Sequence, residues 1–370
     1  MRDAQSSGAA LVSFNAPAFC SYGREQNFNA PVGEYAAFAY TAALNHLLAG
    51  GNNVQHIGDT TVVCWAEGAD PAYQDFAIAA FFGADTGLSD NDLRSALRRL
   101  AEGLPCVDLG IDPDRPFYIL GLAPNAARLS VRFFLRDSFG RLMKNVNDHY
   151  ARLEIVGAKY PTLPIWGLLN ATVRDPKKQT AFPNMADATV RAIFGGTPYP
   201  ASLREAVILR IRAEHNITWA QAAILKAYLQ KNSLERKNDK KERIAEVAQV
   251  QLNEECNDMP YVLGRLFRVM EEIQLASADW KLNRTIKNSY FNAAAATPAN
   301  AFAKLFPLSS YHLKKLMRDK TGLGRKLEDM ESQLVAKLTS TIPARFTQDE
   351  VNCFYIGYYH QENREEENHG

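Results

Sequence analysis

The sequence predicts an α+β fold, in which a mixed α/β N-terminal half is followed by an all-helical half that ends in a helical bundle. Two observations support this prediction. Short runs of β-branched and aromatic residues, typical of strands, stop before about residue 184. Beyond that point apolar residues recur at helical spacing, and the region after Met259 carries several such stripes, enough for a compact bundle.

Strands are predicted at three places in the N-terminal half. Residues 61–65 combine β-branched side chains with flanking glycines, and residues 117–122 form a second apolar run. From residue 129 to residue 135 every second residue is apolar, which is the period of a strand with one half-polar face.

Helices are predicted around and after these strands. Residues 40–48 place their apolar side chains on one face, and Ser89 is a predicted N-cap for the next helix. Ser202 followed by Glu205 predicts a capping box. Helical patterns then cover residues 186–194, 201–214, 218–231 and 240–256.

The C-terminal region carries its own helix signals. Pro298 is suited to a first helical position, and Pro307 is expected to interrupt that helix. Residues 322–326 contain two glycines and are interpreted as a turn between helices. Thr347 with Glu350 predicts a capping box for the last helix.

These signals predict five parts along the chain. They are a disordered tail (1–12), a mixed α/β domain (13–183), a helical connecting region (184–258), a C-terminal helical bundle (259–361) and a disordered acidic tail (362–370).

Composition excludes several classes of protein. The five cysteines are scattered and never form a C-x-x-C pair, which argues against a disulfide framework or a zinc site and fits a reducing compartment. No apolar run approaches the roughly 20 residues that span a bilayer. The N-terminus lacks the apolar core of a secretory signal. We therefore expect a cytoplasmic protein.

No catalytic motif is evident. The sequence has no G-x-x-x-x-G-K-[ST] loop, no H-E-x-x-H among its seven histidines and no G-x-S-x-G elbow. Asp112 and Asp114 could hold magnesium, but they lie among prolines, so turn residues are the favoured interpretation. We expect no catalytic residue, no metal site and no cofactor.

The strongest functional signal is electrostatic. Residues 281–326 contain ten basic residues and one acid, Asp319. Such an excess cannot be neutralised locally, so on a helical bundle it forms a basic face that attracts polyanions. The predicted nucleic-acid-binding residues are Lys281, Arg284, Lys287, Lys304, Lys314, Lys315, Arg318, Lys320, Arg325 and Lys326.

Aromatic residues are interleaved with these cations. Rings beside cations suit single-stranded nucleic acid, because bases stack on the rings while phosphates meet Lys and Arg. The alternative is that the rings belong to the core, and we favour that alternative for most of them. The residues concerned are Tyr290, Phe291, Phe302, Phe306 and Tyr311.

A weaker basic set lies on the predicted strand at 129–135. Arg128, Arg132 and Arg136 are spaced every fourth residue, so on a regular strand they share one face and could follow a phosphate backbone. Ion pairs within an acidic domain are an equally good interpretation.

Several blocks of sequence are similar to the large subunit of the type I-C CRISPR Cascade surveillance complex. They are residues 11–31 (LVSFNAPAFCSYGREQNFNAP), 34–46 (EYAAFAYTAALNH), 58–66 (GDTTVVCWA), 119–133 (ILGLAPNAARLSVRF), 261–267 (YVLGRLF) and 354–361 (FYIGYYHQ). The blocks span nearly the whole chain in the expected order. Members of this family carry a further domain before the Phe-Asn-Ala-Pro motif at 14–17, so the chain is expected to lack that N-terminal domain.

The resemblance implies a non-catalytic, DNA- and RNA-binding subunit of an antiviral CRISPR-guided complex. It implies three kinds of partner: the backbone subunits of the complex, target double-stranded DNA with its displaced strand, and a helicase-nuclease recruited in trans. It also implies that the C-terminal bundle resembles the small subunit of Cascade, and that Met259 is an internal translation start for that part.

Two asparagines in the first block have an open role. Asn15 and Asn29 each precede Ala-Pro, so they either cap a turn or present amides to bases, to an RNA backbone or to a neighbouring subunit. Two other functions are alternatives for the whole chain. A metal-dependent nuclease would need clustered carboxylates or histidines, which the sequence offers only scattered, and a purely protein-binding adaptor would need no basic face.

Overall fold

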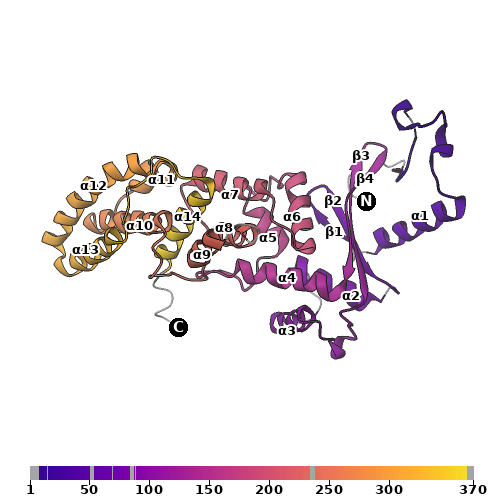
Figure 1. Ribbon diagram of the computed structural model, residues 1–370, viewed down its shortest axis with the longest axis horizontal. Coiled ribbons are helices and arrows are strands. Elements are labelled where there is room, and N and C mark those ends of the chain that lie inside the picture. Colours follow the sequence, from indigo (N-terminus) through magenta and orange to yellow (C-terminus); the bar gives the residue numbers. More distant parts are fainter. Residues whose placement is uncertain are drawn as a thin grey trace. The chain divides into compact units, whose positions relative to one another are not determined.

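The computed structural model describes residues 8–364 apart from 15, 51–53, 69, 84–86, 88 and 234–237. By packing, the chain divides into two units. Figure 1 labels the helices and strands. Unit 1 comprises Met1–His149, Pro164–Asn170 and Asp175–Pro200, and unit 2 comprises Tyr150–Leu163, Ala171–Arg174 and Ala201–Gly370. The boundaries expected at 183/184 and 258/259 follow the sequence pattern rather than this packing, and they stay predictions.

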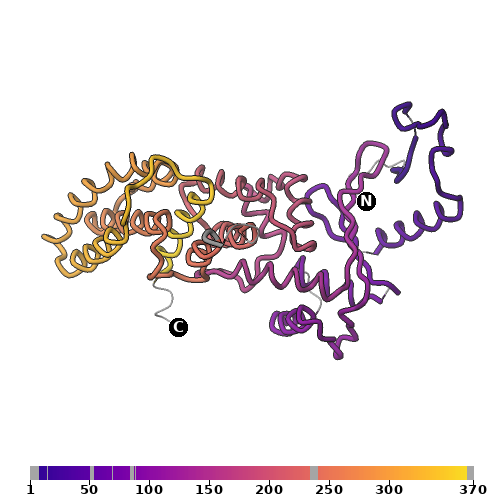
Figure 2. The backbone as a smooth tube through the Cα atoms, in the orientation of Figure 1, coloured from indigo at the N-terminus to yellow at the C-terminus, as the bar shows by residue number. Residues whose placement is uncertain are grey.

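Within its described residues, unit 1 is built on a four-stranded antiparallel sheet whose strands are ordered as in the chain. The strands are β1 (Val54–Ile57), β2 (Thr60–Ala66), β3 (Pro116–Asn125) and β4 (Arg128–Ser138). β3 and β4 run side by side as a hairpin (Figure 2). The three predicted strands are confirmed as β2, β3 and β4.

Helices complete unit 1. Ser89 accepts a hydrogen bond from the backbone N–H of Asp92 at 3.2 Å, which confirms it as an N-cap. The helices are α1 (Glu34–Ala49), α2 (Pro71–Phe82), α3 (Asp90–Ala101), α4 (Phe139–Leu153, whose last turn belongs to unit 2), α5 (Ile165–Asn170) and α6 (Pro183–Gly195). Short 3₁₀ turns lie at Pro17–Phe19, Gln26–Asn29 and Val107–Leu109.

The core of unit 1 lies on one face of the sheet. Phe139, at the start of α4, is fully buried, and its ring centroid lies 4.9 Å from that of Phe117 on β3 and 5.0 Å from that of Tyr73 on α2. Phe117 and Ile119 are buried, whereas Tyr118 between them is only half-buried. This alternation means that β3 presents one face to the core and the other to a more open surface.

Unit 2 contains helices and no strand within the residues that the structure describes, which confirms the predicted loss of strands in the second half. Its helices are α7 (Ala201–Glu214), α8 (Trp219–Ser233), α9 (Asn238–Val247), α10 (Met259–Ser277), α11 (Ile286–Ala296), α12 (Pro298–Asp319), α13 (Thr321–Ala336) and α14 (Gln348–Glu362). Over the described ranges of both units, no helix has the length and apolar character needed to cross a membrane.

Helices α10 and α14 of unit 2 pack closely against each other, and glycine makes this possible. A Cβ added at Gly264 of α10 would lie 2.0 Å from the carbonyl oxygen of Phe354, and one added at Gly357 of α14 would lie 2.1 Å from the carbonyl oxygen of Tyr261. Both obstacles are backbone atoms, which cannot rotate away. The two helices therefore cross backbone against backbone, and only glycine fits at the crossing.

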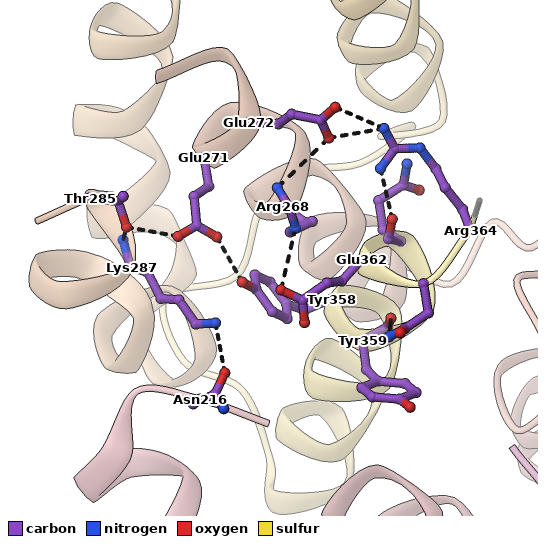
Figure 3. A network of polar contacts seen from close by, with 12 residues as sticks. Asn216, Arg268, Glu271, Glu272, Thr285, Lys287, Tyr358, Tyr359, Glu362 and Arg364 are labelled. Carbon is purple, nitrogen blue, oxygen red and sulfur yellow. Dashed lines mark hydrogen bonds and ion pairs between the residues drawn. The ribbon is translucent and has the colours of Figure 1, made fainter. Parts of the chain in front are cut away.

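Polar contacts hold the same helices together (Figure 3). Glu271 of α10 accepts hydrogen bonds from the hydroxyls of Thr285 and Tyr358, each at 2.7 Å. Glu272 of α10 accepts two hydrogen bonds from Arg364 at 2.9 and 3.0 Å, and its carboxylate also lies 3.7 Å from the guanidinium of Arg268. The carboxylates of Glu271 and Glu272 thus both have polar partners, as low exposure requires.

Four predicted helix signals in the second half are wrong, one of them the extent of the helix expected over 240–256, which ends at Val247 as α9. Ser202 lies inside α7, which begins at Ala201, so it is not an N-cap. Pro307 lies inside α12 without ending it, since Pro307 is exposed and buried residues on both sides of it anchor the helix. Gly322 and Gly324 belong to α13 rather than to a turn. By contrast, the Thr347–Glu350 capping box is confirmed.

Gly264→Ala tests the glycine crossing. The added methyl must push α10 away from α14, so we expect the free energy of unfolding of unit 2 to fall by about 2 kcal/mol or more. Gly322→Ala is the matched control, because no atom lies within 4 Å of its added Cβ. It should leave stability unchanged or raise it by up to about 1 kcal/mol through helix propensity. Urea unfolding followed by circular dichroism measures both, and equal stabilities would contradict the tight crossing.

Candidate nucleic-acid interface

One side of α12 gathers exposed cations around an exposed ring. Lys304, Tyr311, Lys314, Lys315 and Arg318 are all exposed, and Tyr311 exposes 68% of its surface. At 3.6 residues per turn they lie within about 100° of each other around the helix and span about 21 Å along it. We call these five residues the basic stripe.

The opposite side of α12 explains why the basic stripe faces solvent. Phe302, Leu305, Leu313 and Leu316 are buried and fall on the far side of the helix. α12 packs against α10, α11 and α13. An amphipathic helix of this kind has one orientation in the bundle, so its polar side is exposed.

Two acids reduce the charge at the C-terminal end of the basic stripe. Arg318 donates to Asp319 at 2.9 Å, and Lys320 lies 2.6 Å from the carboxylate of Asp279. The pKa of Asp319 is lowered mainly by the hydrogen bond from Arg318, and that of Asp279 mainly by the one from Lys320. Asp279 lies just before the basic region in sequence, so a count over 281–326 missed it.

Of the other predicted cations, four are exposed and one, Lys287, is half-buried. Lys281 and Arg284, between α10 and α11, are exposed, and so are Arg325 and Lys326 on α13. Lys287 instead donates to Asn216 at 3.0 Å, and its Nζ lies 4.8 Å from the centroid of the Tyr358 ring (Figure 3). Lys287 therefore serves the packing of unit 2.

Most of the interleaved rings belong to the core, as favoured from the sequence. Phe291 and Phe302 are fully buried, and Tyr290 and Phe306 are half-buried. Tyr311 differs, since it stands out from α12 among the lysines. Of these rings it is the one placed to meet a base.

The prediction that Arg128, Arg132 and Arg136 share one face is wrong, because a β-bulge interrupts β4. Gly121 pairs with Phe133 and Leu122 with Val131, which leaves Arg132 as an extra residue. Arg128 pairs with Asn125 and Arg136 with Tyr118. Asn125 and Tyr118 are an odd number of residues apart on β3, so their side chains point to opposite faces of the sheet. Because paired residues share a face, Arg128 and Arg136 also point to opposite faces.

Arg132 forms ion pairs, which was the other interpretation of the three arginines. Its guanidinium lies 3.3 Å from the carboxylate of Asp59 and 3.7 Å from that of Asp187 on α6. Asp187 also accepts a hydrogen bond from Thr60 at 2.7 Å. Burial raises the pKa of Asp187, and the bond from Thr60 and the charge of Arg132 oppose that effect. Arg128 lies over the ring of Phe19, 3.8 Å from its centroid.

The side chain of Asn29 closes a loop. Its Oδ1 accepts from the backbone N–H of Ser21 at 2.9 Å, and its Nδ2 donates to the carbonyl oxygens of Arg24 and Gln26 at 2.9 and 3.1 Å. The amide thus plays the turn role that was one of its two expected uses. Asn15 lies outside the described residues.

The carboxylates weighed for magnesium also form a turn. The Oδ1 of Asp112 accepts from the backbone N–H of Asp114 at 2.9 Å. Among the described residues no group of three or more His, Cys, Asp or Glu side chains is placed to hold a metal ion.

Comparison with known proteins identifies the family. The family model described as CRISPR-associated protein (Cas_Csd1) matches residues 1–365. No match to a curated protein was found. The match covers nearly the whole sequence, and it agrees with the CRISPR resemblance seen in the sequence blocks. The chain therefore belongs to the Csd1 family of CRISPR-associated proteins.

Proposed function

We propose that the chain is a non-catalytic, nucleic-acid-binding subunit of a type I-C CRISPR-guided surveillance complex. The basic stripe on α12 is the observation that carries this proposal, because it joins four exposed cations and an exposed ring on one side of a helix. Membership in the Csd1 family supports the class of complex.

Unpaired DNA fits the basic stripe better than a duplex does. Cations alone would bind any polyanion, but Tyr311 lies one helical turn from Lys314 and Lys315. A base stacked on that ring brings its phosphates to the neighbouring ammonium groups. In a duplex the bases are paired and stacked on one another, so no base face is free. The displaced strand of an opened target is the unpaired DNA that such a complex creates.

The proposed partners follow from this role. The subunit supports binding of target double-stranded DNA, stabilises the displaced strand and helps to recruit a helicase-nuclease in trans. It does so as part of a complex with CRISPR RNA and backbone subunits, in the cytoplasm.

Removing charge from the basic stripe tests the proposal. The variant Lys314→Ala/Lys315→Ala/Arg318→Ala loses about three phosphate contacts, so the slope of log K against log salt for single-stranded DNA should fall by about 2. Helix content should hardly change, because alanine favours the helix. Fluorescence anisotropy of a labelled oligonucleotide over a salt series gives the slope.

The matched control removes the same charge elsewhere. Arg141, Lys144 and Lys178 are exposed cations of unit 1, each ion-paired with a nearby aspartate. Replacing all three with alanine should leave the slope near that of the wild type. An unchanged slope in the α12 variant would mean that the basic stripe faces something other than nucleic acid.

We also propose that the segment from Met259 onward is made as a separate product. Met259 is the first residue of α10, directly after the N-cap Asp258. Helices α10 to α14 follow it and pack on one another, although α14 also packs on α8. The segment therefore begins at a helix start and contains the whole basic stripe.

Expression of the intact gene with a C-terminal tag tests this second product. We expect a full-length band and a short band carrying residues 259–370, and Met259→Leu should remove the short band alone. The substitution conserves an apolar side chain, so the full-length product remains as the internal control. A short band that survives the substitution comes from proteolysis and would contradict the internal start.

A further inference from the structure

The open face of the unit 1 sheet carries aromatic rings from three different strands. Trp65 of β2 is paired with Tyr118 of β3, and their ring centroids lie 5.3 Å apart with planes inclined by 12°. The ring centroid of Phe134 on β4 lies 6.2 Å from that of Tyr118, and the two ring planes are inclined by 23°. The third pair, Trp65 and Phe134, has ring centroids 6.4 Å apart and planes inclined by 34°. All three rings therefore lie against one another on this face, and we call the three together the ring row.

Burial does not account for the ring row. The core side chains of the same strands, Phe117 and Ile119, lie on the other face and are fully enclosed. Phe134 exposes 54% of its surface, and Trp65 and Tyr118 are half-buried. Cross-strand aromatic pairs stabilise a sheet modestly. Leaving a ring as exposed as Phe134 in water contributes little to that stability, so the row presents flat apolar surface to a partner.

A cation stands beside Tyr118 of the ring row. Arg136 pairs with Tyr118 across the sheet, and its guanidinium carbon lies 5.6 Å from the centroid of that ring. Arg136 is exposed and makes no ion pair with any residue that the structure describes. Arg132, four residues earlier, is by contrast held by two aspartates. Flat rings beside an unneutralised guanidinium match a ligand that has both π-faces and anionic groups.

An apolar hollow adjoins the ring row. Its volume is about 380 Å³, and it lies between α1 and the sheet. Trp65 belongs to both features, so a base that stacks on the row also meets the rim of the hollow. The lining residues include Tyr40 and Leu44 of α1 with Trp65, Leu120, Leu122 and Val131 of the sheet.

We propose that Trp65, Tyr118 and Phe134, with Arg136, form a stacking platform for the unpaired bases of a single nucleic-acid strand. Every base has a π-face, so stacking on the rings needs no particular sequence, while Arg136 pairs with a phosphate. The platform lies in unit 1 and the basic stripe in unit 2. The two surfaces are thus made by different residues, and the platform does not rest on the proposed function of α12.

Substitutions at Phe134 test the stacking step with little risk to the fold, because this ring is exposed. Phe134→Leu keeps an apolar side chain but removes the π-face, and it should weaken binding of oligo(dT) and oligo(U) by about fivefold or more. Phe134→Tyr keeps the face and should bind as the wild type does. Arg136→Gln should lower the salt slope by about 0.7, whereas neither Phe134 variant should change it.

The indole of Trp65 gives a direct readout on the full chain. Stacking of a base should quench tryptophan emission in the wild type, and the Trp65→Phe variant should lose that quenching while it still binds. The titration is repeated with the Lys314→Ala/Lys315→Ala/Arg318→Ala variant, in which the platform acts alone. Quenching that persists there supports the platform whatever the fate of the α12 proposal. Emission that no oligonucleotide changes, or equal affinities for Phe134→Leu and wild type, would overturn it.

Discussion

The crossing of α10 and α14 at Gly264 and Gly357 is the constraint on which unit 2 depends. With no Cβ on either helix at this point, the two backbones come into contact, and the rings of Phe267, Phe354 and Tyr358 close around the crossing. α10 is also the helix on which α11, α12 and α13 pack. Its position therefore decides which side of each neighbour is buried and which side remains for binding.

The same packing separates structural charge from charge that is free to bind. On α10, Glu271 and Glu272 have hydroxyl or guanidinium partners, because an unpaired carboxylate would be costly at such low exposure. At the α10–α14 contact, the side chains of His360 and Tyr261 form a hydrogen bond of 3.0 Å. Burial lowers the pKa of His360 to about 3, so the His360 ring stays neutral. The cations of the basic stripe lie outside this core, on the exposed side of α12.

Local signals in the sequence predicted much of the fold, whereas contacts between distant residues could not be predicted. The N-caps Ser89 and Thr347 need only their own first turn, so the residue types were enough. The bulge at Arg132 depends on the register with β3, and the pairing of Lys320 with Asp279 depends on how two helix ends meet. The exposed cations of α12 were predicted because charge excess is visible in sequence, but the ring row needs three strands in register.

Photochemical cross-linking is the most direct test of the central claim, that the exposed side of α12 holds an unpaired DNA strand. A single-stranded oligonucleotide carrying photoreactive bases is bound to the full chain, irradiated and digested, and the modified peptides are identified by mass spectrometry. We expect adducts on the peptides that contain residues 304–318, with Tyr311 as a principal site, because its ring lies among the cations of the basic stripe. Bound DNA that forms adducts only outside α12 would contradict the claim.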